Sequence, residues 1–189
     1  MKQKQKAELF RKMHDRSGIL VLPNAWDAAS ARIFELAGFP AVGTTSAGIA
    51  ASLGYPDREQ ISRGEMAKAV SRIAGAVKIP VSADVEAGYG PIPKAVQQTV
   101  AAVIEAGAAG INFEDGTRDH VRPLLDPDLQ CDRIRIAREA SKRDGGDLVI
   151  NARTDVFLIE FGAERKRFDH AVRRANAYRA AGADCLFIP

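Results

Sequence analysis

The sequence of 189 residues contains only two cysteines and no long hydrophobic run. Two thiols, at Cys131 and Cys185, are too few for a disulfide framework, so we expect both to be buried and reduced. The best apolar stretch covers residues 19–22, whereas a membrane span needs about 18 apolar residues. The charged N-terminus is not followed by the apolar segment of a signal peptide. We therefore expect a cytoplasmic protein with no membrane partner.

The sequence also lacks a strong excess of charge of one sign. Its 27 basic and 24 acidic residues give a formal net charge of +3 and a pI near 9.0. The densest basic cluster is Arg165–Arg167 with Arg173 and Arg174, in a helical pattern that also holds Glu164 and Asp169. Such mixed charge favours a solvated helix face over a nucleic-acid site, so no nucleic-acid partner is expected.

Signatures of nucleotide binding are missing as well. The pattern G-x-x-x-x-G-K-[ST] does not occur, and the segment after residue 22 begins Pro-Asn-Ala-Trp-Asp without a glycine. Gly88 and Gly90 follow a later expected strand, but Pro91 comes next and a third glycine does not fit. A dinucleotide-binding sheet needs a glycine-rich turn after its first strand. This absence favours a closed α/β barrel over an open doubly wound sheet.

The residues that are present alternate between short apolar runs and longer helical patterns. Crossovers of a dozen or more residues predict a parallel sheet in a single domain over residues 1–189. Glycines that follow alanine, at Gly38, Gly107 and Gly182, predict helix ends that lead directly into strands. The expected strands are 19–22, 41–45, 81–85, 110–114, 148–153 and 184–188, and the expected helices are 3–15, 26–37, 58–77, 92–106, 127–143 and 164–181.

Polar side chains line one face of three neighbouring expected strands. Because side chains alternate along a strand, residues two apart share a face. The opposite faces are apolar and suit packing against outer helices. The polar faces extend to the carboxyl ends of the strands, where α/β barrels hold their active sites. Their residues are Ser82, Asp84, Glu86, Asn112, Glu114, Asn151, Arg153 and Asp155.

Three carboxylates in that set indicate a metal site. We expect Asp84, Glu86 and Glu114 to lie close together, and ionised carboxylates in one pocket need protons or a cation to coexist. Since no cysteine or histidine falls on the same strand ends, the oxygen ligands favour Mg²⁺, or Mn²⁺, over Zn²⁺. The alternative is a structural network in which Arg153 and nearby lysines balance the acids.

Two features suit an anionic ligand. The planar fork of Arg153 matches a carboxylate or phosphonate, although the same side chain could serve only to balance the acids. The loop Thr45–Gly48 combines hydroxyls with backbone N–H groups and so predicts an anion nest. Ser46 is not expected to be a covalent nucleophile, since Thr44 stands where a nucleophile elbow has glycine. His120, in the loop after the fourth strand, either reaches the site or is simply exposed.

Six short segments carry motifs in a specific order from about Gly18 onward. They are Leu22-Pro-Asn-Ala-Trp-Asp-Ala-Ala-Ser-Ala-Arg32, Thr45-Ser-Ala-Gly48 with Leu53-Gly-Tyr-Pro-Asp57, Asp84-Val-Glu-Ala-Gly-Tyr-Gly90, Asn112-Phe-Glu-Asp-Gly116, Asn151-Ala-Arg-Thr-Asp155 and Ala181-Gly-Ala-Asp-Cys-Leu-Phe-Ile-Pro189. Together they resemble the isocitrate lyase/phosphoenolpyruvate mutase superfamily. The resemblance implies an α/β fold of the (β/α)8 TIM-barrel type and a homo-oligomer, usually a tetramer that exchanges a C-terminal helix. With six expected strands, we expect a barrel truncated after the sixth strand, its C-terminal units missing.

The resemblance also implies the chemistry. Substrates are small 2-oxo or 2-hydroxy acids, and a C–C or P–C bond next to a carbonyl is broken or made through a metal-bound pyruvate enolate. A Mg²⁺ binds near the acids, partly through water, and the loop after the second strand holds the substrate carboxylate. The implied residues are Asp84, Glu86 and Glu114 for the metal, Thr45, Ser46, Ala47, Gly48, Asn112 and Arg153 for the substrate, and Asp57 and Arg153 for catalysis.

Two departures from the family pattern narrow the choice of reaction. Lyases of the superfamily carry Lys-Lys-Cys-Gly-His in the loop after the fourth strand, and this loop has no cysteine. The mutase and phosphonopyruvate hydrolase branch carries a lysine directly after the Glu-Asp pair, where this chain has Gly116. We therefore expect a decarboxylase-like or short-gate C–C lyase. The alternatives are mutase- or hydrolase-type P–C chemistry and a ligand-binding barrel without catalysis.

Overall fold

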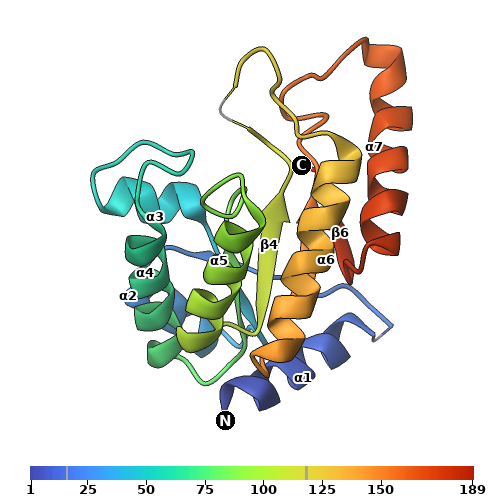
Figure 1. Cartoon of the computed structure of the whole chain (residues 1–189). Helices are drawn as coiled ribbons and strands as arrows, with labels where there is room; N and C mark the ends of the chain where they lie inside the picture. Colours follow the sequence, from blue (N-terminus) through green and yellow to red (C-terminus); the bar gives the residue numbers. More distant parts are fainter. Residues whose placement is uncertain (16, 118) are drawn as a thin grey trace.

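The computed structural model describes residues 1–15, 17–117 and 119–189, and its strands form one parallel sheet (Figure 1). The strands lie in sequence order, and each pairs in parallel with the next. Within the described residues, the first and last strands pair on one side only, so the sheet is open there. The predicted parallel sheet is confirmed. The strands are β1 (Asn24–Ala25), β2 (Val42–Thr44), β3 (Val81–Asp84), β4 (Gly110–Glu114), β5 (Val149–Arg153) and β6 (Cys185–Phe187).

The helices agree with the prediction to within a few residues, with two exceptions. The expected helix 58–77 begins only at Arg63, because Ser62 and Glu65 form a capping box that fixes its start. A short helix that was not predicted begins where the Thr45 hydroxyl accepts the N–H of Gly48 at 3.2 Å. The helices are α1 (Gln3–His14), α2 (Ala28–Leu36), α3 (Ser46–Ser52), α4 (Arg63–Ala76), α5 (Pro93–Glu105), α6 (Pro127–Arg143) and α7 (Glu164–Ala180). In the described ranges, no helix combines the length and the hydropathy required to cross a bilayer.

The predicted first strand at residues 19–22 is wrong. Ile19 is 94% exposed and Val21 57% exposed, while Leu20 and Leu22 pack against the apolar cluster around Phe10 of α1. The alternating pattern thus belongs to a segment that packs on the apolar cluster without pairing as a strand, and strand pairing begins only at Asn24.

The two cysteines are both free, as expected, but only one is fully buried. Cys131 is buried on α6, whereas Cys185 on β6 is only partly buried. Burial nevertheless raises the pKa of the Cys185 thiol to about 11, so the thiol form dominates at neutral pH.

Three glycines close helices as predicted. Gly38, Gly107 and Gly182 adopt φ values of 90°, 90° and 113°, just beyond the ends of α2, α5 and α7. A residue with a Cβ is strained at such positive φ, whereas glycine is not. The recurring Ala-Gly corner therefore reports the turn from each of these helices into the next strand.

Helix α1 lies across the amino ends of the strands, opposite the polar ends (Figure 1). The amide of Gln3 donates to the carbonyl of Ala108 at 2.7 Å, next to the start of β4. Phe10 is 1% exposed and packs in a cluster with Ala109 and Val149. A Cβ at Gly110 would lie 2.8 Å from the Phe10 ring, so glycine makes room for this ring. The amino ends of the strands are thus covered by the apolar side chains of α1, whereas the carboxyl ends carry polar side chains.

Replacing Phe10 with alanine should lower the free energy of unfolding by about 3–5 kcal/mol, because it leaves a cavity where the ring is packed. Urea unfolding followed by circular dichroism measures the loss. Lys4→Ala, at an exposed position of the same helix, serves as the matched control and should change stability by less than about 0.5 kcal/mol. A loss below about 1 kcal/mol for Phe10→Ala would show that α1 is not part of the core.

Candidate active site

A pocket of about 1350 Å³ opens at the carboxyl ends of the strands. It lies between the α3–α4 loop and the β4–α6 loop, and residues that follow β3, β4 and β5 line it. Five predicted site residues face it: Ser46, Asp57, Glu86, Glu114 and Arg153. The other predicted residues, Thr45, Ala47, Gly48, Asp84 and Asn112, are not among its lining residues.

Asp84 at the end of β3 is bound by the loop that was predicted to hold a substrate anion. Its Oδ2 accepts hydrogen bonds from the backbone N–H of Ser46 at 2.9 Å and from the Ser46 hydroxyl at 2.8 Å. Thr45 and Gly48 bond to each other as the cap of α3. In this structure Ser46 of the predicted nest therefore holds Asp84, and Ser46 alone of the four loop residues also lines the pocket.

A row of polar side chains crosses the sheet beside Asp84. The strand register places Asp84, Asn112 and Asn151 next to one another on β3, β4 and β5. The Asn112 amide donates to Asp84 Oδ1 at 3.2 Å, and the Asn151 amide donates to Asn112 Oδ1 at 3.1 Å. Asn112 thus orients Asp84 through its side-chain amide. A contact of Asn112 with a substrate stays a prediction.

Glu86 lies just after β3 and lines the pocket. Its own backbone φ is 49°. Its two oxygens accept hydrogen bonds from the Tyr89 hydroxyl, at 3.1 Å, and from the backbone N–H of Glu59. Burial raises the pKa of Glu86 to about 7, against these two hydrogen bonds and with the help of nearby Asp57 and Asp84. This carboxyl group therefore sits where a negative charge lacks full compensation.

Glu114 and Asp155 flank the guanidinium of Arg153. Arg153 Nη1 lies 3.4 Å from Glu114 Oε2, and Arg153 Nε donates to Asp155 Oδ1 at 2.5 Å. Burial raises the pKa of Glu114 to about 8, although Arg153 opposes the shift, and the carboxylates of Asp155 and Asp84 add to it. One guanidinium does not balance the acids around it.

The described residues contain no group of three histidine, cysteine, aspartate or glutamate side chains placed to hold a metal ion by themselves. The predicted trio therefore does not form a complete ligand set by itself, although its charges still act on one another. The donor set is made only of oxygens, and its negative charge is not balanced. Those properties fit a hard divalent ion such as Mg²⁺, which binds through one or two carboxylates and keeps several waters.

Two predicted residues lie in the loops at the rim of the pocket. Asp57 is exposed in the α3–α4 loop and lines the pocket, and its charge helps to raise the pKa of Glu86. His120 is exposed as well and also lines the pocket. His120 is thus an exposed loop residue at the edge of the pocket, and a contact with the substrate stays a prediction.

The structure brings in residues to which the sequence analysis gave no role. Tyr89 and Glu59 hold Glu86, but they lie in loops where no periodicity marks them. Spacing did place Asp155 on the polar face with Arg153, but it did not show that the two side chains bond to each other. Arg174 contradicts the predicted solvated basic face, because it is 6% exposed and pairs with buried Asp115 at 2.9 Å.

Comparisons with known proteins agree with this fold and with the family resemblance. A family model for phosphoenolpyruvate phosphomutase matches residues 10–189. The 2-methylisocitrate lyase of Escherichia coli K12 is 33% identical over 185 residues, which cover 94% of this chain and 60% of that enzyme. An uncharacterised protein of Mycobacterium tuberculosis H37Rv is 35% identical over 95% of this chain and 64% of its own length. The chain thus spans less than two thirds of the length of these curated relatives.

Solved structures give the same picture at the level of the fold. A protein of Burkholderia cenocepacia J2315, provisionally named a phosphonomutase, matches with a TM-score of 0.91 and 43% identity over 98% of this chain and 75% of that one. A 2,3-dimethylmalate lyase matches with a TM-score of 0.84 and 33% identity over 97% of this chain and 61% of that one. The predicted TIM-barrel-type α/β fold and the predicted resemblance are confirmed. The chain belongs to the phosphoenolpyruvate phosphomutase family, within the isocitrate lyase/phosphoenolpyruvate mutase superfamily.

Proposed function

We propose that this protein is a Mg²⁺-dependent lyase that cleaves a C–C bond next to the carbonyl of a small 2-oxo or 2-hydroxy acid. The observation that carries the proposal is the placement of Arg153 among Glu114, Asp155 and Asp84 at the polar end of the sheet. Relatives support the substrate class, since they include a 2-methylisocitrate lyase and an oxaloacetate acetylhydrolase solved with its product oxalate.

Arg153 binds the carboxylate of the substrate in this proposal. Asp155 engages its Nε, while Nη1 lies toward Glu114 at 3.4 Å, a distance that leaves donor capacity for a stronger acceptor. A guanidinium fork binds a carboxylate by two parallel hydrogen bonds and fixes its plane as well as its position. Binding of the carboxylate thereby fixes the orientation of the C–C bond to be broken relative to the carboxylates of β3 and β4.

The residues that would hold the metal are Asp84, Glu86 and Glu114, largely through water. When bound, Mg²⁺ supplies Lewis-acid stabilisation of the negative charge that develops on the carbonyl oxygen as the C–C bond breaks. The protein prepares these ligands in advance. Ser46 and Asn112 hold both oxygens of Asp84, and Tyr89 and Glu59 hold both oxygens of Glu86.

Two hydrogen bonds fasten the loops around the pocket to each other. The Glu59 carboxylate accepts the backbone N–H of Tyr89 at 2.7 Å, and Arg63 donates to the carbonyl of Tyr89 at 2.9 Å. The α3–α4 loop is thus tied to the loop that follows β3. This connection fixes the position of Tyr89, whose hydroxyl holds Glu86.

Mutase- or hydrolase-type P–C chemistry is the second candidate, and the name of the matching family and a phosphoenolpyruvate phosphomutase of Streptomyces platensis subsp. rosaceus favour it. That structure matches with a TM-score of 0.85 and 31% identity over 96% of this chain and 63% of its own. One observation weighs against this chemistry. A Cβ at Gly116 would lie 2.8 Å from Asp155 Oδ2, so the lysine that this branch carries there would require the Asp155 side chain to move away from its present position.

Turnover assays with oxaloacetate, 2-methylisocitrate and phosphonopyruvate test the proposal. We expect release of pyruvate or another 2-oxo acid from a substrate with a C–C bond to cleave, dependent on Mg²⁺ and abolished by excess EDTA. Glu114→Gln should lose at least about tenfold in kcat/KM, because it removes one charge from the metal site. Lys94→Gln, which changes a charge outside the pocket lining, is the control and should leave turnover unchanged.

Three results would contradict the proposal in different ways. Full activity in excess EDTA would show that the reaction does not need a metal ion. Turnover of phosphonopyruvate alone would favour P–C chemistry. Calorimetric binding of oxalate with Mg²⁺, without turnover of any of the three acids, would show a ligand-binding barrel that is not an enzyme.

The working form is proposed to be a cytoplasmic homo-oligomer, as the superfamily resemblance implies. Light scattering coupled to gel filtration measures the mass of the assembly, and a monomer at assay concentration would contradict this part.

A further inference from the structure

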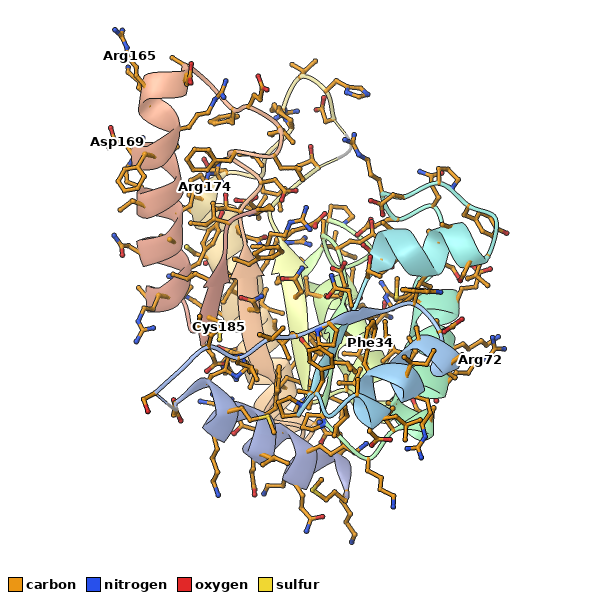
Figure 2. The ribbon with its side chains drawn as sticks, turned by 180° about the vertical axis from the view of Figure 1, so that it is seen from behind. Phe34, Arg72, Arg165, Asp169, Arg174 and Cys185 are labelled. Atoms are coloured by element: carbon orange, nitrogen blue, oxygen red, sulfur yellow. The ribbon has the colours of Figure 1, made fainter. Side chains whose placement is uncertain are left out.

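Asp115 is a buried carboxylate directly beneath the pocket. It follows Glu114 at the end of β4 and is 0% exposed. Its Oδ2 accepts the Tyr178 hydroxyl at 2.6 Å and Arg174 Nη1 at 2.9 Å. Both donors come from α7, where they are one turn apart and also bond to each other at 2.9 Å. Figure 2 shows Arg174 on the side of α7 that faces the sheet, whereas Arg165 and Asp169 point outward.

The other oxygen of Asp115 reaches the end of the neighbouring strand. Asp115 Oδ1 accepts the backbone N–H of Asp155 at 3.1 Å, and the backbone N–H of Asp115 donates to the carbonyl of Arg153 at 3.2 Å. Leu125 donates its N–H to the carbonyl of Asp115, and its own carbonyl accepts Arg174 at 2.9 Å. Asp115 therefore joins the end of β5, the β4–α6 loop and α7 at one point.

Asp155 connects Asp115 to the pocket, because it bonds to Arg153. Its Oδ1 accepts Arg153 Nε, and its Oδ2 lies against Gly116, where a Cβ would be 2.8 Å away. The backbone N–H and one carboxylate oxygen of Asp155 are thus both bonded, and the other oxygen lies close to Gly116. Because Asp155 holds the Nε of Arg153, the position of the Asp155 carboxylate determines the direction in which the two terminal nitrogens of Arg153 point.

We infer that Asp115, held by Arg174 and Tyr178, is a positioning residue that fixes Asp155 and, through it, the guanidinium of Arg153 in the pocket. Neutralising a buried carboxylate needs only Arg174. The additional hydroxyl of Tyr178 and the backbone N–H of Asp155 leave Asp115 no freedom to rotate, which is what positioning requires and charge balance does not. Helix α7, on the outside of the sheet, therefore contributes to the geometry of the substrate-binding arginine.

Tyr178→Phe tests the inference, since it removes one hydroxyl and keeps the buried ring. The first readout is the rate at which phenylglyoxal modifies Arg153, measured by peptide mass spectrometry on the folded protein. Loss of a hydrogen bond to a charged group should raise this rate by about tenfold. Exposed Arg135 in the same sample is the internal control and should react at an unchanged rate. Tyr55→Phe is the matched control variant, because Tyr55 is 45% exposed, and it should leave the modification rate of Arg153 unchanged.

Coupling through Asp155 is tested in a double-mutant cycle. Asp155→Asn alone should also accelerate the modification of Arg153, and adding Tyr178→Phe should then change the rate by less than about twofold. An unchanged rate in Tyr178→Phe, or full additivity of the two substitutions, overturns the inference and leaves Asp115 as a purely structural ion pair.

The second readout is the affinity for oxalate with Mg²⁺, which rests on the proposed function. Tyr178→Phe should weaken oxalate binding by about tenfold and raise KM more than it lowers kcat. The labelling experiment needs no ligand, so it decides the positioning role even if the wild-type protein binds no oxalate. In that case it is the proposed function that fails.

Discussion

Replacing Arg174 with methionine is expected to lower the free energy of unfolding by about 3–5 kcal/mol, because it leaves a buried carboxylate without its counter-charge. Asp115 has no contact with water, and its partners within the described chain are Arg174, the Tyr178 hydroxyl and one backbone N–H. Methionine fills a similar volume, so the loss measures the charge pair more than a cavity. Equilibrium unfolding in urea at pH 7 provides the measurement.

The matched control lies next to it on the same helix. Arg173 is exposed, and its hydrogen bonds within the described part of the chain stay on its own helix, so Arg173→Met should change the free energy of unfolding by less than about 0.5 kcal/mol. Adding Asp115→Asn to Arg174→Met should restore part of the stability, because the stranded charge is then removed. A loss below about 1 kcal/mol in the single variant would mean that water reaches Asp115.

Replacing Arg153 with lysine should reduce kcat/KM by about 10²–10³-fold for whichever acid the protein turns over, comparable to the loss of one oxyanion-hole donor. Lysine keeps the charge, but a single ammonium cannot bond Asp155 through one nitrogen and present a planar pair of donors to a carboxylate. Steady-state kinetics under saturating Mg²⁺ measure the change. Circular dichroism establishes that the variant is folded.

Arg135→Lys is the control for this substitution. Arg135 makes an exposed ion pair with Asp132 on α6, outside the pocket lining, and the same chemical change there should leave kcat/KM within about twofold. A reduction of less than about threefold in Arg153→Lys would show that the bidentate fork is not used. The role proposed for Arg153 would then reduce to balancing the charges of Glu114 and Asp155.

Much of the fold follows from local patterns. Gly38, Gly107 and Gly182 mark helix ends because a left-handed backbone conformation can be recognised from a single residue type. The long helices are predicted to within a few residues because amphipathic periodicity repeats over several turns. The expected strand at residues 19–22 failed for the converse reason. A short alternating run looks the same whether it pairs as a strand or only packs its apolar side chains against an apolar cluster, as Leu20 and Leu22 do.

The polar face of β3, β4 and β5 was predictable, because residues two apart in a strand must share a side. Its internal partnerships were not. Ser46 and Asp84 are 38 residues apart, and nothing in either segment indicates that the serine binds the aspartate. The same holds for Arg174 and Asp115, 59 residues apart. The local pattern around Arg174 is that of a charged helix surface, and the pattern cannot show which turn of the helix faces the sheet.

The amino-acid sequence by itself determined which side chains reach the carboxyl ends of the strands, since strand alternation and the order of the family motifs are properties of the chain alone. Only the tertiary structure decided how those side chains are paired: which carboxylates already have donors, which face the pocket, and which arginine is buried behind it. The physical reason is that hydrogen bonds and ion pairs extend over only about 3–4 Å. A small change in how helices and loops pack onto the sheet therefore determines the partners, while the periodicity of the sequence stays the same.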